Sequence, residues 1–157
     1  MHTQRSWLNT DATMSRVLAC SMIFMLAAAA AVPASAQQQV DRKGAASKVM
    51  LEQVISSHLT PLNGKYKLQA TETTYEPGGY TALHDHVGPG IRYVLSGEIS
   101  FVQEGKETIF KAGDYFYEAG NISNAVSNKA SSPVRILIFE VLPADWKGGS
   151  AVPPIKK

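Results

Sequence analysis

Two histidines separated by a single residue, His84 and His86, are the first candidates for chemistry in this sequence. In a β-strand, residues i and i+2 point to the same face, so the two imidazoles would lie side by side about 6 to 7 Å apart. Imidazole nitrogens are good ligands for transition metals, and the pair therefore predicts a metal-binding or ligand-binding site. Two exposed histidines with no shared role are the alternative reading of the same spacing.

The residues on either side of this pair indicate the elements that would hold it. Short β-rich runs recur at intervals of roughly ten residues, and Gly, Pro, Asn and Asp separate them. About eight strands without a long helix predict a sandwich or a barrel that closes its own edges. The expected runs are residues 65–75, 81–86, 91–96, 98–103, 107–111, 115–118, 122–127 and 134–142.

The spacing around the histidines resembles the first motif of the cupin family. That motif runs Gly, five residues, His-x-His, three residues, Glu, six residues, Gly. Gly78, His84, His86 and Gly97 fall in place, and residues 93–99 read YVLSGEI, which is similar to the family's usual ending.

A second cupin motif is matched in part, by Gly113 and Asn128. The resemblance covers roughly residues 65–142. The resemblance implies an all-β fold, a cupin-type jelly-roll β-barrel in a single domain, which agrees with the number of expected strands.

Two departures from these motifs bear on metal binding. The family's Glu ligand falls at Gly90 and its third His falls at Asn124, so the implied metal ligands are reduced to His84, His86 and Asn124. A neutral amide is a poor ligand for a divalent transition metal, although water can complete the shell. The sequence therefore leaves two alternatives open, a bound Fe, Mn, Ni, Cu or Zn and a site without metal.

The alternation of side chains along a strand makes Arg92 a further candidate, as an anion-binding residue. If Gly90 faces the barrel interior as the family's Glu does, Arg92 two residues later faces inward too, where a guanidinium suits a carboxylate or phosphate. A bulge in the loop before Gly90 would instead turn Arg92 to solvent. Tyr93 and Glu118 complete the predicted ligand-binding set, Glu118 as a substitute carboxylate or a structural residue. No catalytic residue is identified.

The first 36 residues have the pattern of a signal peptide. Sixteen uncharged residues, 17–32, follow Arg16 and precede an Ala-x-Ala site that ends at Ala36. We therefore expect cleavage after Ala36, a periplasmic or secreted protein, and no stable membrane anchor afterwards. Translation would begin at Met1 or at Met14.

The remaining chain divides into three parts. Residues 37–64 are expected to form a lead-in, flexible at first and ambiguous between a helix and a short strand from residue 49. Residues 65–142 form the predicted barrel, and residues 143–157 are expected to form a flexible tail.

Composition limits the function further. The chain has 157 residues, 15 Lys and Arg against 13 Asp and Glu, a net charge of +2 and one cysteine, which excludes disulfide frameworks and Cys-based zinc clusters and gives no case for nucleic acid. Removing 36 of the 157 residues leaves 121 with no cysteine, so we expect a homodimer to add buried surface.

Two classes of function remain open. The first is a module that binds a small polar or anionic molecule in the barrel mouth, and the second is a metal-dependent oxygenase, isomerase or lyase.

Overall fold

The computed structural model describes residues 39–155, which fold into an antiparallel β-barrel. The prediction of an all-β single domain is confirmed. The strands are β1 (Arg42–Val54), β2 (Tyr66–His86), β3 (Gly90–Ser96), β4 (Glu98–Gln103), β5 (Lys106–Lys111), β6 (Tyr115–Glu118), β7 (Asn124–Ser127), β8 (Val134–Pro143) and β9 (Ala151–Val152), with a short 3-10 turn η1 (Thr60–Leu62) between β1 and β2.

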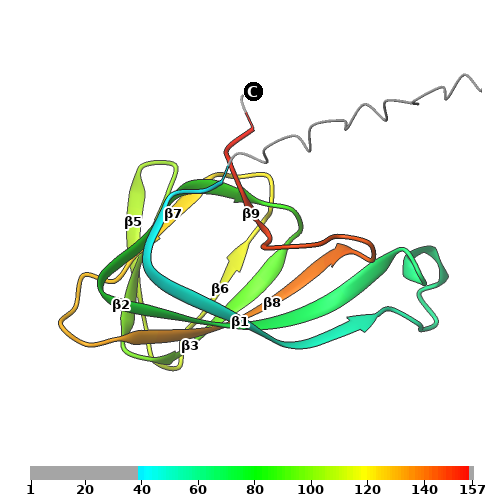
Figure 1. Cartoon of the computed structure of the whole chain (residues 1–157), viewed down its shortest axis with the longest axis horizontal. Coiled ribbons are helices and arrows are strands. Elements are labelled where there is room, and N and C mark those ends of the chain that lie inside the picture. The colour runs from blue at the N-terminus through cyan, green and yellow to red at the C-terminus, as the bar shows by residue number, and fades with distance from the viewer. Residues whose placement is uncertain (1–38, 156–157) are drawn as a thin grey trace, which may run out of the picture. The chain divides into compact units, whose positions relative to one another are not determined.

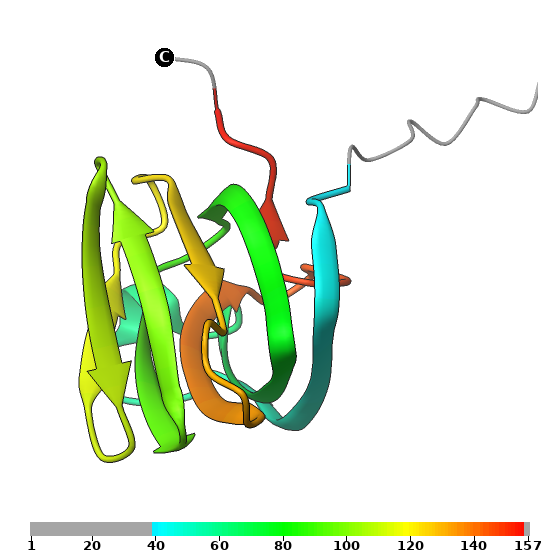
Figure 2. The ribbon, with the colours of Figure 1, turned by 90° about the vertical axis from the view of Figure 1, so that its left-hand side faces the viewer.

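The strands form one curved sheet in the order β5-β4-β7-β2-β8-β3-β6, with β1 and β9 paired to β2. Seen from the side chosen in Figure 1, they make a ring. Figure 2 shows β1 on the side of the ring away from β4 and β5. Every pairing is antiparallel, and several neighbours in the sheet are far apart in sequence. This topology brings residues from distant parts of the chain into one site.

The long strand β2 lines the interior with polar side chains. From Lys67 to Tyr75, every second residue is buried, as expected when one face of a strand points inward. These inward residues are Lys67, Gln69, Thr71, Thr73 and Tyr75. Beyond Gly78, which has a φ of 72°, β2 changes partners from β8 to β7.

The apolar core fills the part of the barrel beside this polar face. Phe101, Phe110 and Phe116 pack together there, the last two stacked with ring centroids 4.4 Å apart. Tyr75 and Ile136 belong both to this core and to the lining of a cavity, so the cavity lies directly on the core.

Two segments differ from what the sequence suggested. Residues 42–54 of the expected lead-in form β1, which pairs along β2 from Arg42 opposite Thr81 to Val54 opposite Lys67. Its side chains are mostly exposed, as suits a strand at the edge of a sheet. In the expected tail, β9 pairs with the end of β2.

The predicted signal peptide lies outside the described residues, so cleavage and export stay predictions. Within residues 39–155, no helix is long and apolar enough to cross a membrane.

Asn128, which matches the second motif, ties the loop before β8 to β2. Its side-chain amide donates hydrogen bonds to the Tyr75 and Ser132 carbonyl oxygens at 3.0 and 2.8 Å, and its oxygen accepts one from the Ala130 N–H at 3.0 Å. Replacing Asn128 with Ala removes these three bonds, of which the one to the Tyr75 carbonyl oxygen is buried, and we expect the free energy of unfolding to fall by about 2 kcal/mol.

Urea unfolding measures this loss, with Asn63→Ala as the control. Asn63 makes comparable bonds to the Ser57 backbone in a more exposed turn, where water replaces them, so its loss should be smaller. Equal losses in the two variants would contradict this role for Asn128.

Candidate functional site

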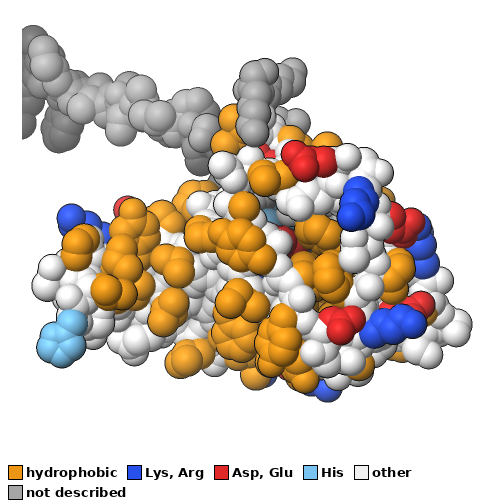
Figure 3. All heavy atoms as spheres, turned by 180° about the vertical axis from the view of Figure 1, so that it is seen from behind, with side chains coloured by type: hydrophobic (Ala, Val, Ile, Leu, Met, Phe, Trp, Pro, Cys, Tyr) orange, Lys and Arg blue, Asp and Glu red, His pale blue; other side chains and the backbone are white. Residues whose placement is uncertain are grey.

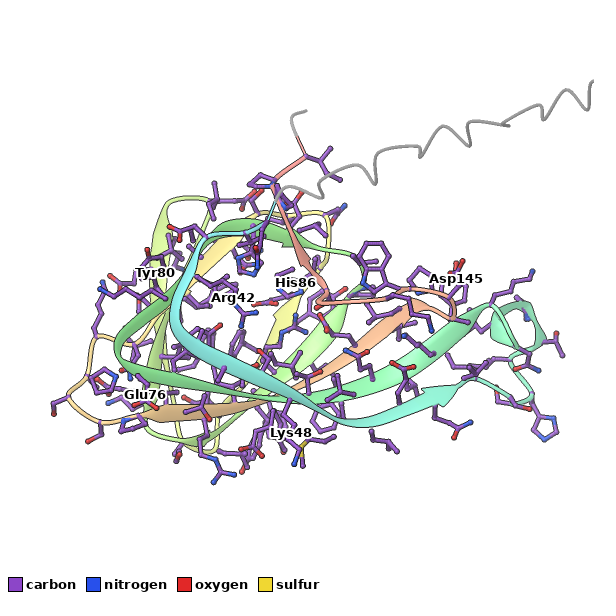
Figure 4. The ribbon with its side chains drawn as sticks, viewed as in Figure 1. Arg42, Lys48, Glu76, Tyr80, His86 and Asp145 are labelled. Atoms are coloured by element: carbon purple, nitrogen blue, oxygen red, sulfur yellow. The ribbon has the colours of Figure 1, made fainter. Side chains whose placement is uncertain are left out.

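An open cavity of about 700 Å³ lies within the barrel. Hydroxyl groups and an ionic cluster line it. Figure 4 shows Arg42 and His86 inside the ring of strands, whereas Lys48, Glu76 and Tyr80 lie outside it. The ionic cluster consists of His84, His86, Arg92, Glu118 and Glu140, all of which line the cavity.

The two histidines meet through their Nε2 atoms, which are 3.0 Å apart. His84 Nδ1–H donates to the Ala82 carbonyl oxygen at 2.7 Å, so the neutral ring presents the lone pair of Nε2 to His86. His86 lies between two carboxylates, with Nε2 at 2.9 Å from Glu118 Oε2 and Nδ1 at 2.8 Å from Glu140 Oε1. The two rings therefore differ in their surroundings: His84 bonds to a backbone carbonyl, whereas His86 contacts two carboxylates.

Gly90 is the centre of the cluster, although it has no side chain. It is the direct cross-strand partner of Glu118 on β6 and of Glu140 on β8. This register places two carboxylates in one row with a gap between them. The Arg92 guanidinium fills the gap, in an ion pair with Glu118 and at 3.0 Å from Glu140 Oε1, and Arg92 is only 2% exposed.

The gap admits no side chain at position 90. A Cβ there would lie within 3.0 Å of the Arg92 guanidinium, the Phe139 carbonyl oxygen and the Glu140 side chain. Glycine is therefore required for the strands to approach this closely.

Burial and the neighbouring charges set the protonation states. Burial, and then the charge of His86, lower the pKa of His84 to about 4. Burial alone would lower the pKa of His86, but its bonds to Glu118 and Glu140 outweigh burial and raise it. Burial opposes ionisation of Glu118, yet His86 and Arg92 bring its pKa down to about 2, and they lower the pKa of Glu140 in the same way. These shifts favour the ionised forms of His86, Glu118 and Glu140 and the neutral form of His84.

The chain's last segment covers this cluster. Ser150 Oγ donates to both Glu140 oxygens, at 2.8 and 2.7 Å, from the residue before β9. Asp85, between the histidines, is also buried, and it accepts hydrogen bonds from Ser123 Oγ and from the Ile155 N–H. Strand β2 thus positions the histidines on one face and holds the C-terminal segment with the other.

A divalent metal does not fit the residues that are present. In residues 39–155, no group of three or more His, Cys, Asp or Glu is arranged to hold one. The position of the family's Glu ligand is occupied by the Arg92 guanidinium, whose positive charge opposes a second cation. Asn124 lies opposite His84 on β7, and its buried Oδ1 has no hydrogen-bond partner among the described residues, but Asn124 is not part of the cavity lining.

The other residues predicted from the sequence divide between the two faces of the sheet. Arg92 and Glu118 lie in the cluster, with no bulge between Gly90 and Val94 to reverse the alternation. Tyr93 lies on the opposite face, where its ring packs against Tyr115 at 4.5 Å between centroids. It therefore does not reach the cavity.

The sequence analysis missed three residues of this site. Glu140 could have been predicted from the sequence, because it is a charged residue inside the apolar run of β8 and such residues are seldom buried without a partner. Ser150 and Arg42 had none, since each reaches the cavity through a strand pairing that is distant in sequence.

The mouth of the cavity carries unpaired positive charge. Four Lys and Arg side chains line the cavity: Arg42, Lys67, Arg92 and Lys147. Lys67 is neutralised by Glu52 at 2.8 Å, and Arg92 by the cluster. Arg42 and Lys147 are exposed, with no carboxylate of the described residues within 4 Å.

Comparison with known families agrees with this geometry. Residues 71–140 match the cupin domain family. The polyketide cyclase RemF from Streptomyces resistomycificus is similar in structure, with a TM-score of 0.53 and 16% identity over 76% of this chain and 81% of that one. KdgF from Halomonas sp. gives a TM-score of 0.49 and 18% identity over 64% and 84% of the two chains.

These comparisons define the type of fold. The family match over residues 71–140 and the barrel together show a cupin-type fold. Identities this low extend to the fold alone, and no curated protein sequence matches the chain.

The low pKa of His84 predicts a pH dependence of stability. Above pH 6.5, the ring is neutral in the folded and the unfolded chain; below it, only the unfolded chain takes up a proton until about pH 4. Stability should therefore fall by about 2 kcal/mol from pH 7 to pH 5 because of His84 alone. The lowered pKa values of Glu118 and Glu140 act below about pH 4.5, outside this window, whereas the raised pKa of His86 acts above pH 6.5 and offsets part of the loss between pH 7 and pH 6.5.

Urea unfolding at both pH values, in buffer with chelator, checks this prediction. His84→Gln cannot titrate, so the variant should lose most of the difference. A variant with the full wild-type slope would show that another group is responsible.

Proposed function

We propose that this cupin-domain protein binds a small hydroxylated anion in the barrel cavity, with Arg42 at the mouth receiving the anionic group. The exposed, unpaired guanidinium of Arg42 carries the proposal. One of its N–H groups donates to Ser47 Oγ at 2.9 Å, and Ser47 Oγ lies 2.9 Å from Thr73 Oγ1. The other N–H groups are available to a carboxylate, which a guanidinium can hold with two hydrogen bonds.

The wall beyond Arg42 supports a ligand that carries hydroxyl groups. Thr71, Thr73 and Thr81 line the cavity from β2, the strand that also carries the histidine pair. Arg92, which the sequence suggested as the anion-binding residue, is the weaker candidate, because Glu118 and Glu140 already neutralise it.

Calorimetric titration with sugar acids tests this function. Gluconate and galacturonate should bind more tightly than sorbitol and galactose, their neutral counterparts. Arg42→Gln should weaken binding of the acids by roughly 10- to 100-fold, the scale of a charge-assisted hydrogen bond.

Lys48→Gln is the matched control, since Lys48 lies on the same strand but outside the ring. It should bind the acids as the wild type does. Neutral sugars binding as tightly as the acids, equal losses in the two variants, or no acid binding stronger than about 1 mM would each contradict the proposal.

The same samples separate a binding module from an enzyme. The neutral His84 and the cationic His86 form a pair of groups whose pKa values are driven apart, an arrangement that can also transfer protons. NMR spectra of the acid after prolonged incubation show an unchanged molecule for a binding module and new signals for an isomerase or lyase.

We also propose that two copies pair through the outer face of the sheet. Tyr117, Ile91 and Phe139 are direct cross-strand neighbours there, and they are 60%, 51% and 46% exposed. The same cross-strand row continues from Phe139 to Ala70 and Leu51, and none of these residues is charged. Figure 3 shows hydrophobic side chains gathered over one face of the molecule. A second copy fits such a row, because an uncharged apolar surface is complementary to itself.

Light scattering after size-exclusion chromatography measures the oligomeric state. We expect a dimer for the wild type and a monomer for Ile91→Asp, which places a charge in the centre of the row. Ile109→Asp on β5 is the control and should stay dimeric. A monomeric wild type at high concentration would refute the pairing, as would a dimeric Ile91→Asp.

A further inference from the structure

We propose that the Arg92 guanidinium is the built-in cation of the ionic cluster and that it keeps divalent metals out of this site. It takes the place that a metal-binding carboxylate at position 90 would need, and it neutralises the two carboxylates on either side. The inference concerns metal binding only and does not depend on the ligand proposed above.

The register of the strands creates a demand for positive charge beside Gly90. Glu118 and Glu140 both pair with Gly90, so their carboxylates approach one another from the two sides of β3. Both side chains are almost fully buried, at 4% and 2% exposure. Two buried carboxylates need positive partners, because an uncompensated buried charge costs several kcal/mol.

Arg92 and His86 meet that demand completely. Each contacts both carboxylates, so two positive and two negative charges cancel within the cluster. A divalent ion would add two charges next to a guanidinium whose Nη2 is 3.1 Å from His86 Nδ1. It would also have to displace Arg92 from Glu118 and remove the proton that His86 shares with the same carboxylate.

Without Arg92, small adjustments of three side chains would be enough to form a metal site. His84 Nε2 and His86 Nε2 are 3.0 Å apart, and His86 Nε2 and Glu118 Oε2 are 2.9 Å apart. Two donor atoms at about 2.1 Å from one ion, at right angles to each other, have this separation. Two imidazoles and a carboxylate form a ligand set that suits divalent transition metals. The guanidinium is therefore the group that prevents binding.

Cobalt titration of the untagged, chelator-treated protein tests the proposal. The visible absorption of Co²⁺ reports its ligands, and calorimetry gives the affinity. The wild type should bind Co²⁺ weakly and without imidazole ligation. Arg92→Met should bind one Co²⁺ with an affinity higher by roughly 100-fold or more, the scale on which a site's supporting groups affect metal binding. This binding should disappear when His84 and His86 are both changed to Ala.

Arg135→Met is the matched control, because Arg135 is paired with Glu72 at 2.7 Å on the surface. It should keep the wild-type affinity. If Arg92→Met folds poorly, Arg92→Met combined with Glu140→Gln retains His84, His86 and Glu118 with fewer uncompensated charges, and it should show the same gain.

Two results would overturn the proposal. One is a wild-type protein that binds Co²⁺ through His84 and His86 as tightly as the variants do. The other is failure of both Arg92 variants to gain affinity, whether they fold alone or stay unfolded in the presence of Co²⁺, since a bound metal would stabilise the folded chain.

Discussion

The buried Arg92 guanidinium, held between the carboxylates of Glu118 and Glu140, is the interaction on which the rest of the site depends. Charges with so little access to water are tolerated only as a complete set, because removing one partner leaves another uncompensated. This explains why position 90 must be glycine: its absent side chain leaves the space that the guanidinium occupies. It also explains why the pKa of His86 is raised, because this ring contacts both carboxylates.

The fold serves this cluster by bringing distant strands to one row. Strands β3, β6 and β8 supply the row of Glu118, Gly90 and Glu140, and β2 places the histidines beside it. Ser150, just before β9, covers Glu140 from the C-terminal segment. The polar inward face of β2 and the start of β1 complete a cavity whose floor is ionic and neutral overall, and whose mouth is positively charged. Recognition of an anion would therefore occur at the mouth, with Arg42, rather than at the floor.

The sequence predicted the parts of this arrangement that depend on local spacing. The positions of Gly78, His84, His86 and Gly97, with the number of expected strands, pointed to the barrel, whereas strand alternation left Arg92 open between the cavity and solvent. The partners of Arg92 could not be predicted in the same way, because Glu140 meets Gly90 only through the register of β3 on β8. The same limit applies to β1: an exposed edge strand has little alternation of buried and exposed residues and is defined by its pairing with β2. Tyr93 shows the opposite case, since alternation alone would have placed it outside the cavity.

The protonation of the two histidines is the most direct measure of this cluster. Nitrogen-15 NMR of the imidazole side chains at pH 7 distinguishes a ring with two N–H groups from either neutral tautomer, and the exposed His58 provides an internal reference. The account predicts that His86 is protonated on both nitrogens, facing Glu118 and Glu140, while His84 is neutral with its proton on Nδ1. A neutral His86 at pH 7 would contradict it, because the carboxylates would then lack the second positive charge that the buried cluster requires.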